Sequence, residues 1–133
     1  MRNGKAVVLV VEDELLVRMD AVNVVLEAGY EVEEAAGADE AIRILTSRDD
    51  VELVFTDVQM PGTMDGCELA RYIELRWPRI GIIVTSGVVI PETRTLPLNA
   101  GFLSKPYNSG AILEEMALMI SVSQLFGDRA ISP

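Results

Sequence analysis

Five short apolar runs alternate with longer segments of helical character, and this alternation constrains the fold more than any other feature of the sequence. The first run, AVVLVV, is continuous and rich in β-branched residues, which is typical of a strand covered on both faces. Strands that alternate with helices in this way form a parallel sheet with helices on both sides. The sequence therefore predicts an α/β fold built on a doubly wound, five-stranded parallel sheet. The predicted strands are residues 6–11, 31–35, 51–56, 80–85 and 101–104.

Four of the remaining segments carry apolar residues at helical spacing. The first is predicted to be a helix that stops at Gly29. Its regularly spaced apolar residues are Leu15, Met19, Val22 and Leu26. The other predicted helices, with their inward-facing residues, are 39–48 (Ala41, Ile42 and Leu45), 67–77 (Leu69, Ile73 and Trp77) and 111–124 (Ile112, Met116 and Ile120).

Residues 88–100 stand where one more helix would complete the pattern. Pro91, Pro97 and several β-branched residues predict that this helix is short or broken. Asn108 or Ser109 is well placed to cap the last helix. Because 133 residues suit a single core, we expect one domain over residues 1–125 and a flexible tail at 126–133.

The charge balance excludes several classes of partner. The chain has 21 acidic and 11 basic residues, a formal charge of −10, so it is not expected to bind nucleic acid or a membrane directly. A cation or a basic partner surface would suit it better. The apolar run near the N-terminus is too short for a signal peptide, and Cys67 has no second cysteine to pair with, so a cytoplasmic location is expected. With no histidine, the chain cannot donate a phosphoryl group from phosphohistidine.

Polar residues stand at the carboxyl ends of four of the five predicted strands. They are Glu12 and Asp13, Asp57, Thr85 and Ser86, and Lys105. In a parallel sheet these ends lie at one edge, where ligands bind, so we expect the six side chains to share a crevice. Three carboxylates at close quarters repel one another unless a cation joins them. Oxygen ligands without nitrogen or sulfur point to Mg²⁺.

Each of these residues also has an ordinary structural interpretation. An acid after a strand can cap the next helix, Asp57 can form the turn that follows it, and Lys105 can be a surface lysine. The combination favours the functional interpretation, because four separate strand ends carry the groups that Mg²⁺-dependent phosphoryl transfer needs.

The same residues occur in stretches that resemble the receiver domains of response regulators, the phosphoacceptor modules of two-component signalling. These stretches are VVLVVEDE, VFTDVQMPG, MDG, VTSG and FLSKPY, and the resemblance covers about residues 5 to 122. It implies a flavodoxin-like sheet with strand order 2-1-3-4-5.

The resemblance also implies a role for individual residues. Asp57 is the phosphoacceptor, and Thr85 and Lys105 contact the phosphoryl group. Thr85 and Phe102 form the switch that responds to it, and the Lys105–Pro106 peptide bond is expected to be cis. The implied Mg²⁺ ligands are Glu12, Asp13, Asp57 and the backbone carbonyl of Gln59.

A receiver of this kind is a signalling domain rather than an enzyme, and any hydrolysis of its own phosphoryl group would be slow. We expect it to take the group from a histidine kinase or a histidine phosphotransfer protein, and to signal through an unknown downstream protein. It would act as a stand-alone domain, monomeric or weakly dimeric, although the sequence also fits a receiver excised from a longer protein.

Two other functions are compatible with parts of the pattern. One is a phosphorylation-independent interaction module, although degenerate receivers usually lose an acid or the lysine and this chain has kept them. The other is a Mg²⁺-dependent phosphohydrolase of the haloacid dehalogenase type, which needs an aspartate where Gln59 stands. Three features depart from the common receiver pattern: Phe102 lacks a hydroxyl, the loop at residues 62–66 is one residue longer, and residues 88–100 contain two prolines.

Overall fold

The computed structural model describes residues 6–60, 62, 64–87, 100–105 and 108–131, with side chains in the last helix described as far as Ser121. Five strands and four helices follow one another in this part of the chain. They are β1 (Val7–Val11), α1 (Leu15–Glu27), β2 (Glu31–Ala35), α2 (Ala38–Ser47), β3 (Val51–Asp57), α3 (Gly66–Arg76), β4 (Gly81–Ser86), β5 (Ala100–Ser104) and α4 (Ser109–Ile131).

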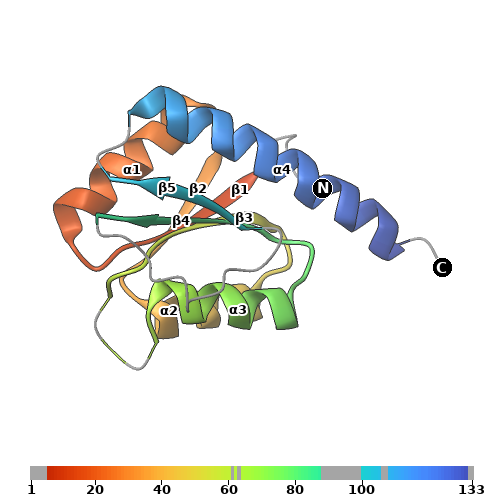
Figure 1. Cartoon of the computed structure of the whole chain (residues 1–133). Coiled ribbons are helices and arrows are strands. Elements are labelled where there is room, and N and C mark those ends of the chain that lie inside the picture. The colour runs from red at the N-terminus through yellow and green to blue at the C-terminus, as the bar shows by residue number, and fades with distance from the viewer. Residues whose placement is uncertain (1–5, 61, 63, 88–99, 106–107, 132–133) are drawn as a thin grey trace.

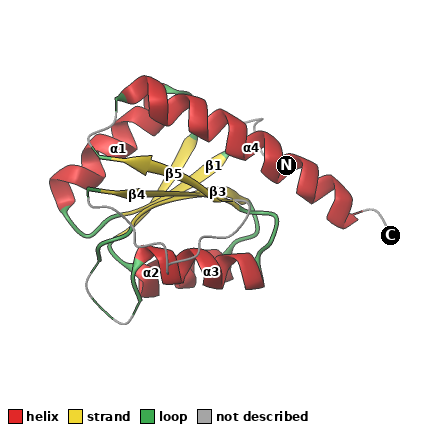
Figure 2. Ribbon diagram, in the orientation of Figure 1, coloured by secondary structure: helices red, strands yellow, loops and turns green. Residues whose placement is uncertain are grey.

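All five strands are parallel and lie in the order β2-β1-β3-β4-β5. Helices α1 and α4 cover one face of this sheet, and α2 and α3 cover the other (Figures 1 and 2). Both the predicted fold class and the strand order implied by the resemblance are therefore confirmed.

The core consists of two apolar layers, one on each side of the sheet. Successive side chains of β1 supply both layers, because residues of a strand point alternately to its two faces. Leu9 packs with the buried residues of α2 and α3, whereas Val8 and Val10 pack with those of α1 and α4. Strands β1, β3 and β4 are buried along their whole length, while β2 and β5 form the more exposed edges.

The first predicted helix exists, but its buried face differs from its most obvious apolar spacing. Ala21 and Val25 are the residues of α1 that are buried. Leu15, Met19 and Leu26 are 58%, 48% and 52% exposed, so their regular spacing indicated a helix without indicating its inner face. The helix ends as predicted before Gly29, whose φ of 93° is a conformation that glycine adopts without strain.

The inward-facing residues predicted for the other helices are buried, except Ile42 and Trp77, which are half-buried against the core. Asn108, rather than Ser109, caps α4: its Oδ1 accepts a hydrogen bond of 2.8 Å from the backbone N–H of Ala111.

The predicted end of the last helix was wrong. Helix α4 continues to Ile131 and runs out past the sheet in Figure 1, so residues 126–131 are helical and not a loose tail. A single glycine, Gly127, costs a helix about 1 kcal/mol relative to alanine, which is too little to end it among leucine, arginine and alanine. The extent of the domain, placed at residues 1–125, stays a prediction.

Two further sequence-based expectations concern parts of the chain outside the described residues. The broken helix expected at residues 88–100 lies there except for Ala100, which begins β5. The Lys105–Pro106 bond also reaches a residue that is not described. Within the described residues, no helix is both long enough and apolar enough to cross a membrane.

Candidate phosphoacceptor site

The carboxyl ends of the strands bring the predicted site residues to one edge of the sheet. Asp57 is the last residue of β3 and stands opposite Thr85 in the register with β4. Lys105 directly follows β5, and its backbone N–H donates a 2.8 Å hydrogen bond to the carbonyl of Ser86. Glu12 follows β1 and is fixed to the end of β2 by a 3.0 Å hydrogen bond from its N–H to the Ala35 carbonyl. Four separate strands thus position the site.

Three carboxylates meet at this edge. Glu12, Asp13 and Asp57 each offer one oxygen, and these oxygens lie within 4.8 Å of one another. Glu12 and Asp57 are buried, with exposures of 6% and 7%, while Asp13 is exposed. The cluster therefore has a protein-lined side and an open side. A site of this form suits Mg²⁺, which combines one or two carboxylates with waters and a phosphate oxygen.

The ammonium of Lys105 lies beside this cluster. Its Nζ is 3.1 Å from Oδ1 of Asp57 and 3.7 Å from Oε1 of Glu12. Although the first of these distances is short, Oδ1 of Asp57 accepts no hydrogen bond, and it is the one buried side-chain polar atom in the described part of the chain that lacks one. The positive charge of Lys105 therefore stabilises this oxygen in place of a hydrogen bond.

The pKa of Glu12 reflects its burial and the carboxylates around it. Burial raises the pKa of its carboxyl above the ordinary value of 4.5, and the nearby charge of Asp57 raises the pKa further. The backbone N–H of Glu14, which donates a 3.1 Å hydrogen bond to Oε2 of Glu12, acts in the opposite direction without cancelling the shift. A cation among the three carboxylates would relieve this strain, and the residues present therefore fit Mg²⁺.

Gly66 is a contributor to the site that the sequence did not single out, apart from its place in the MDG stretch. It begins α3, and its N–H donates a 2.9 Å hydrogen bond to the carbonyl of Val58. A Cβ at this position would collide with the backbone carbonyl of Asp57 and lie 2.8 Å from Cα of Val58. The sequence does contain a signal for this contact: a glycine stands at the start of the helix that follows the strand ending at Asp57. The glycine allows α3 to pack directly against the end of β3.

The roles predicted for the remaining site residues stay predictions. Thr85 and Ser86 are buried at the end of β4. Phe102 lies in β5 opposite Val84 and is 37% exposed. Gln59 is exposed two residues after Asp57, and metal binding by its carbonyl stays a prediction.

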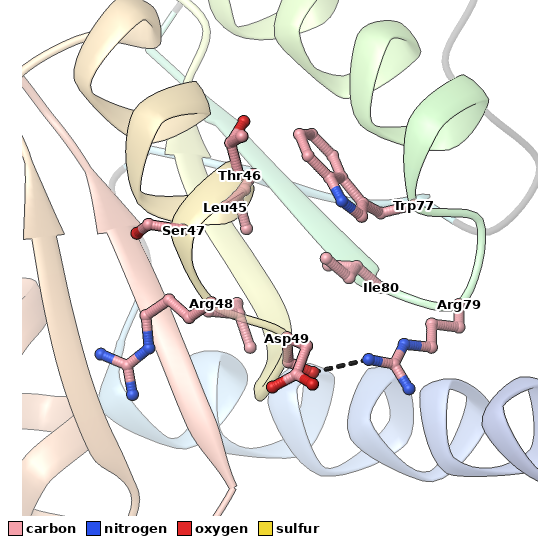
Figure 3. A pocket seen from close by; sticks show the side chains of 9 residues that line it. Leu45, Thr46, Ser47, Arg48, Asp49, Trp77, Arg79 and Ile80 are labelled. Carbon is pink, nitrogen blue, oxygen red and sulfur yellow. Dashed lines mark hydrogen bonds between the residues drawn. The ribbon is translucent and has the colours of Figure 1, made fainter.

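A hollow of about 470 Å³ lies away from this site, at the opposite edge of the sheet, where β3 and β4 begin. Trp77, Leu45 and Ile80 form part of its wall (Figure 3). Several of its polar groups are engaged: Arg79 donates a 2.6 Å hydrogen bond to the backbone carbonyl of Asp49, and the hydroxyls of Thr46 and Ser47 donate to carbonyls of their own helix.

The sequence also matches a known family over most of its length. The model of the response regulator receiver domain fits residues 8–117. The chain belongs to this family. Receiver domains of two-component systems are signalling modules that accept phosphoryl groups, and they bind Mg²⁺ at an acidic pocket.

Individual relatives agree with this membership. The chain is 42% identical over 110 residues to the sensor kinase CckA of Brucella abortus, an alignment that covers 80% of this chain and 12% of that protein. It therefore spans only a small part of that relative's length. The receiver protein of Sinorhizobium medicae shares the fold, with 22% identity, a TM-score of 0.83 and coverage of 92% of this chain and 99% of that one. The response regulator TrrA of Thermotoga maritima, solved in complex with Mg(2+)-BeF, is 26% identical with a TM-score of 0.78, and the match covers 86% of this chain and 98% of that one.

Proposed function

We propose that this receiver takes a phosphoryl group onto Asp57 in a Mg²⁺-dependent reaction, from a histidine kinase or a histidine phosphotransfer protein. The observation that carries the proposal is the state of Asp57 Oδ1, which is buried without a hydrogen bond 3.1 Å from the ammonium of Lys105. The carboxylates of Glu12 and Asp13 support it, because each offers an oxygen within 4.8 Å of one from Asp57 and the three could share a divalent cation. Similarity to a sensor kinase supports a donor of the histidine-kinase class.

The transfer follows from these positions. An oxygen of Asp57 forms a bond to phosphorus while the bond from phosphorus to the donor's imidazole nitrogen breaks, and the imidazole leaves with that electron pair. Lys105 neutralises part of the charge on the phosphoryl oxygens, and the Thr85 hydroxyl donates a hydrogen bond to one of them. Glu12, Asp13, Asp57 and the carbonyl of Gln59 would hold Mg²⁺, which would supply the rest of the neutralisation. Positioning and charge dominate catalysis, as in phosphoryl transfer generally.

The donor's docking surface lies on α1, next to the acidic cluster. Leu15, Leu16 and Met19 are 58%, 75% and 48% exposed at the start of this helix, directly after Glu12 and Asp13. Exposed apolar residues gathered in one place are a common feature of interaction surfaces. A groove of about 750 Å³ lies between α1 and α4, is lined in part by Val17 and Asp20, and reaches Lys105. A partner bound here would present its phosphohistidine close to Asp57.

Phosphotransfer from a panel of purified, autophosphorylated histidine kinases tests this proposal. At least one kinase should pass its label to the wild type within the first time points, and none should label Asp57→Asn. Leu16→Glu, which changes an exposed residue of the proposed docking surface, should slow transfer from that kinase while leaving labelling by a small phosphodonor unchanged. Equal labelling of Asp57→Asn by the kinase would overturn the assignment of the acceptor.

A further inference from the structure

Arg18 connects three elements around the metal pocket, although nothing in its sequence position marked it as functional. It lies one turn into α1, and its side chain is only 17% exposed. Its Nη1 donates a 2.8 Å hydrogen bond to the backbone carbonyl of Glu12, and its Nε donates a 3.0 Å hydrogen bond to Oε1 of Glu34. One guanidinium therefore joins α1 to the segment after β1 and to the end of β2.

The bond to the Glu12 carbonyl has a particular consequence for the site. That carbonyl belongs to the peptide unit that links Glu12 to Asp13, the two acids that would share a cation with Asp57. The peptide unit is planar, so fixing its carbonyl limits the rotation of both neighbouring Cα atoms. The Glu12 N–H is already bonded to the Ala35 carbonyl on the other side. Arg18 supplies the second restraint, and without it the Asp13 end of the segment could turn.

We propose that Arg18 is a positioning residue for the metal pocket: its guanidinium clamps the Glu12–Asp13 peptide against the end of β2 and so holds both carboxylates in place for Mg²⁺. This inference rests on the proposed function, because it concerns the same pocket. Arg18 does not touch the metal or the phosphoryl group itself. Outer contacts of this kind orient the groups that bind a metal, and their loss typically weakens metal binding by about 10- to 100-fold.

The direction in which Arg18 variants change the affinity for Mg²⁺ distinguishes a positioning role from a purely electrostatic one. Arg18 is a cation near an acidic pocket, so its charge alone opposes the binding of Mg²⁺. If charge were its only contribution, Arg18→Gln would bind Mg²⁺ more tightly than the wild type, and Arg18→Lys would bind it equally well. Positioning predicts weaker binding in both variants, because lysine keeps the charge but lacks the planar fork that bonds two acceptors from two nitrogens.

Mg²⁺ titrations of the unphosphorylated full chain by calorimetry test the proposal. Arg18→Gln should weaken binding by about tenfold or more, and Arg18→Lys by a smaller factor. Glu34→Gln is the matched control, because it keeps an oxygen for Nε of Arg18 and leaves the contact with Glu12 intact. The ion pair that it removes is exposed on the Glu34 side, so the affinity for Mg²⁺ should stay within about twofold of the wild type. Arg43→Gln, a change of an exposed arginine in α2, controls for net charge.

Amide hydrogen exchange in metal-free buffer provides a readout that is independent of Mg²⁺. Exchange of the Glu14 amide, which donates to the Glu12 carboxylate, should accelerate in both Arg18 variants and not in Glu34→Gln. Mg²⁺ binding by Arg18→Gln that is as tight as wild type, or tighter, would overturn the inference, and if that variant fails to fold, the same result in Arg18→Lys would do so. Failure of the wild type itself to bind Mg²⁺ would instead contradict the proposed function.

Discussion

At Asp57, the environment of a single oxygen decides what the carboxylate can do. Oδ1 is shielded from solvent and lies close to a cation, yet it accepts no hydrogen bond. No hydrogen bond has to be broken before this oxygen can bond to another group. Its neighbour Glu12 shows the cost of the same crowding, because burial raises the pKa of the Glu12 carboxyl.

Replacing Glu12 by glutamine should stabilise the metal-free protein at neutral pH. Because the folded-state pKa of Glu12 is raised, the folded protein binds this proton more tightly than the unfolded chain does. Stability is therefore lost as the pH rises from 4.5 through the raised pKa, and it stays lost above it. Glu12→Gln cannot ionise and avoids this loss. Its melting temperature should exceed that of the wild type at neutral pH, and the difference should shrink as the pH falls toward 4.5.

Thermal melts across this pH range, in the presence of a chelator, provide the measurement. Glu14→Gln serves as the control, because Glu14 is exposed and only its backbone contacts the site. A Glu12→Gln protein that is less stable than wild type at neutral pH would contradict the prediction.

The grouping of charged side chains at the strand ends could be predicted from the sequence, because it depends only on residue type and on the geometry of parallel sheets. The acids Glu12, Asp13 and Asp57 and the base Lys105 meet as that reasoning expected. The clamp by Arg18 could not be found in this way. A surface arginine and an interior one look alike in sequence, and only the three-dimensional path of α1 places its guanidinium on the Glu12 carbonyl.

At the scale of the elements, the start of α3 lies in direct contact with the end of β3 that carries Asp57. Its first residue packs against the backbone of Asp57, and its start is fixed by reciprocal hydrogen bonds of 2.9 and 3.0 Å between Asp65 and Glu68. The helix thereby supports the end of β3 from one face of the sheet.

Gly66→Ala should destabilise the protein and slow phosphorylation, because the added methyl group meets backbone atoms that cannot move aside easily. Overpacking of this kind costs about 1–3 kcal/mol. Chemical denaturation and phosphorylation time courses give the two readouts. Gly37→Ala is the matched control, since a Cβ there meets no atom within 4 Å; as a helix N-cap substitution it should cost less than about 1 kcal/mol. Equal behaviour of the two variants would show that the contact at Gly66 is unimportant.

Hydrophobic periodicity predicted where the helices and strands lie in the sequence. It did not always predict which face of a helix is buried or where the helix ends. In α1 the exposed residues Leu15, Leu16 and Met19 carry the same apolar signal as buried ones. A periodic pattern cannot tell a core face from a docking face, because both are apolar. The continuation of α4 to Ile131 was also missed, although the glycine within that stretch costs a helix only about 1 kcal/mol.

On the scale of the whole molecule, the parallel sheet links the pocket to a distant edge. Asp57 stands opposite Thr85 in the register of β3 and β4, and Thr85 stands opposite Leu103 next to Phe102 in β5. A change at Asp57 would therefore have a short path through two strands to the partly exposed ring of Phe102. The strand order that creates this path is common to receiver folds, which is why the resemblance could supply it and composition could not.

Binding of beryllofluoride with Mg²⁺ should change amide hydrogen exchange at residues 86–87 and 100–105 as well as around the pocket. The bound group offers acceptors that Thr85 can reach by moving inward, and Phe102 can fill the space that this movement leaves, since its ring has no hydroxyl to satisfy. Thr85→Ala should abolish the distant change but not the local one. If exchange changed only near Glu12 and Asp57, the protein would act as a phosphoryl carrier or sink rather than as a conformational switch.

The most direct test of phosphoryl transfer to Asp57 is the intact mass of the protein after incubation with a small phosphodonor and Mg²⁺. The wild type should gain one phosphoryl group, because in the described part of the chain Asp57 is the acid that combines a buried oxygen without a hydrogen bond, a nearby Lys105 and two further carboxylates. Omitting Mg²⁺ should suppress the gain, and Asp57→Asn should show none. A phosphoryl group on Asp57→Asn at the wild-type level, or two groups on the wild type, would contradict the assignment of Asp57 as the acceptor.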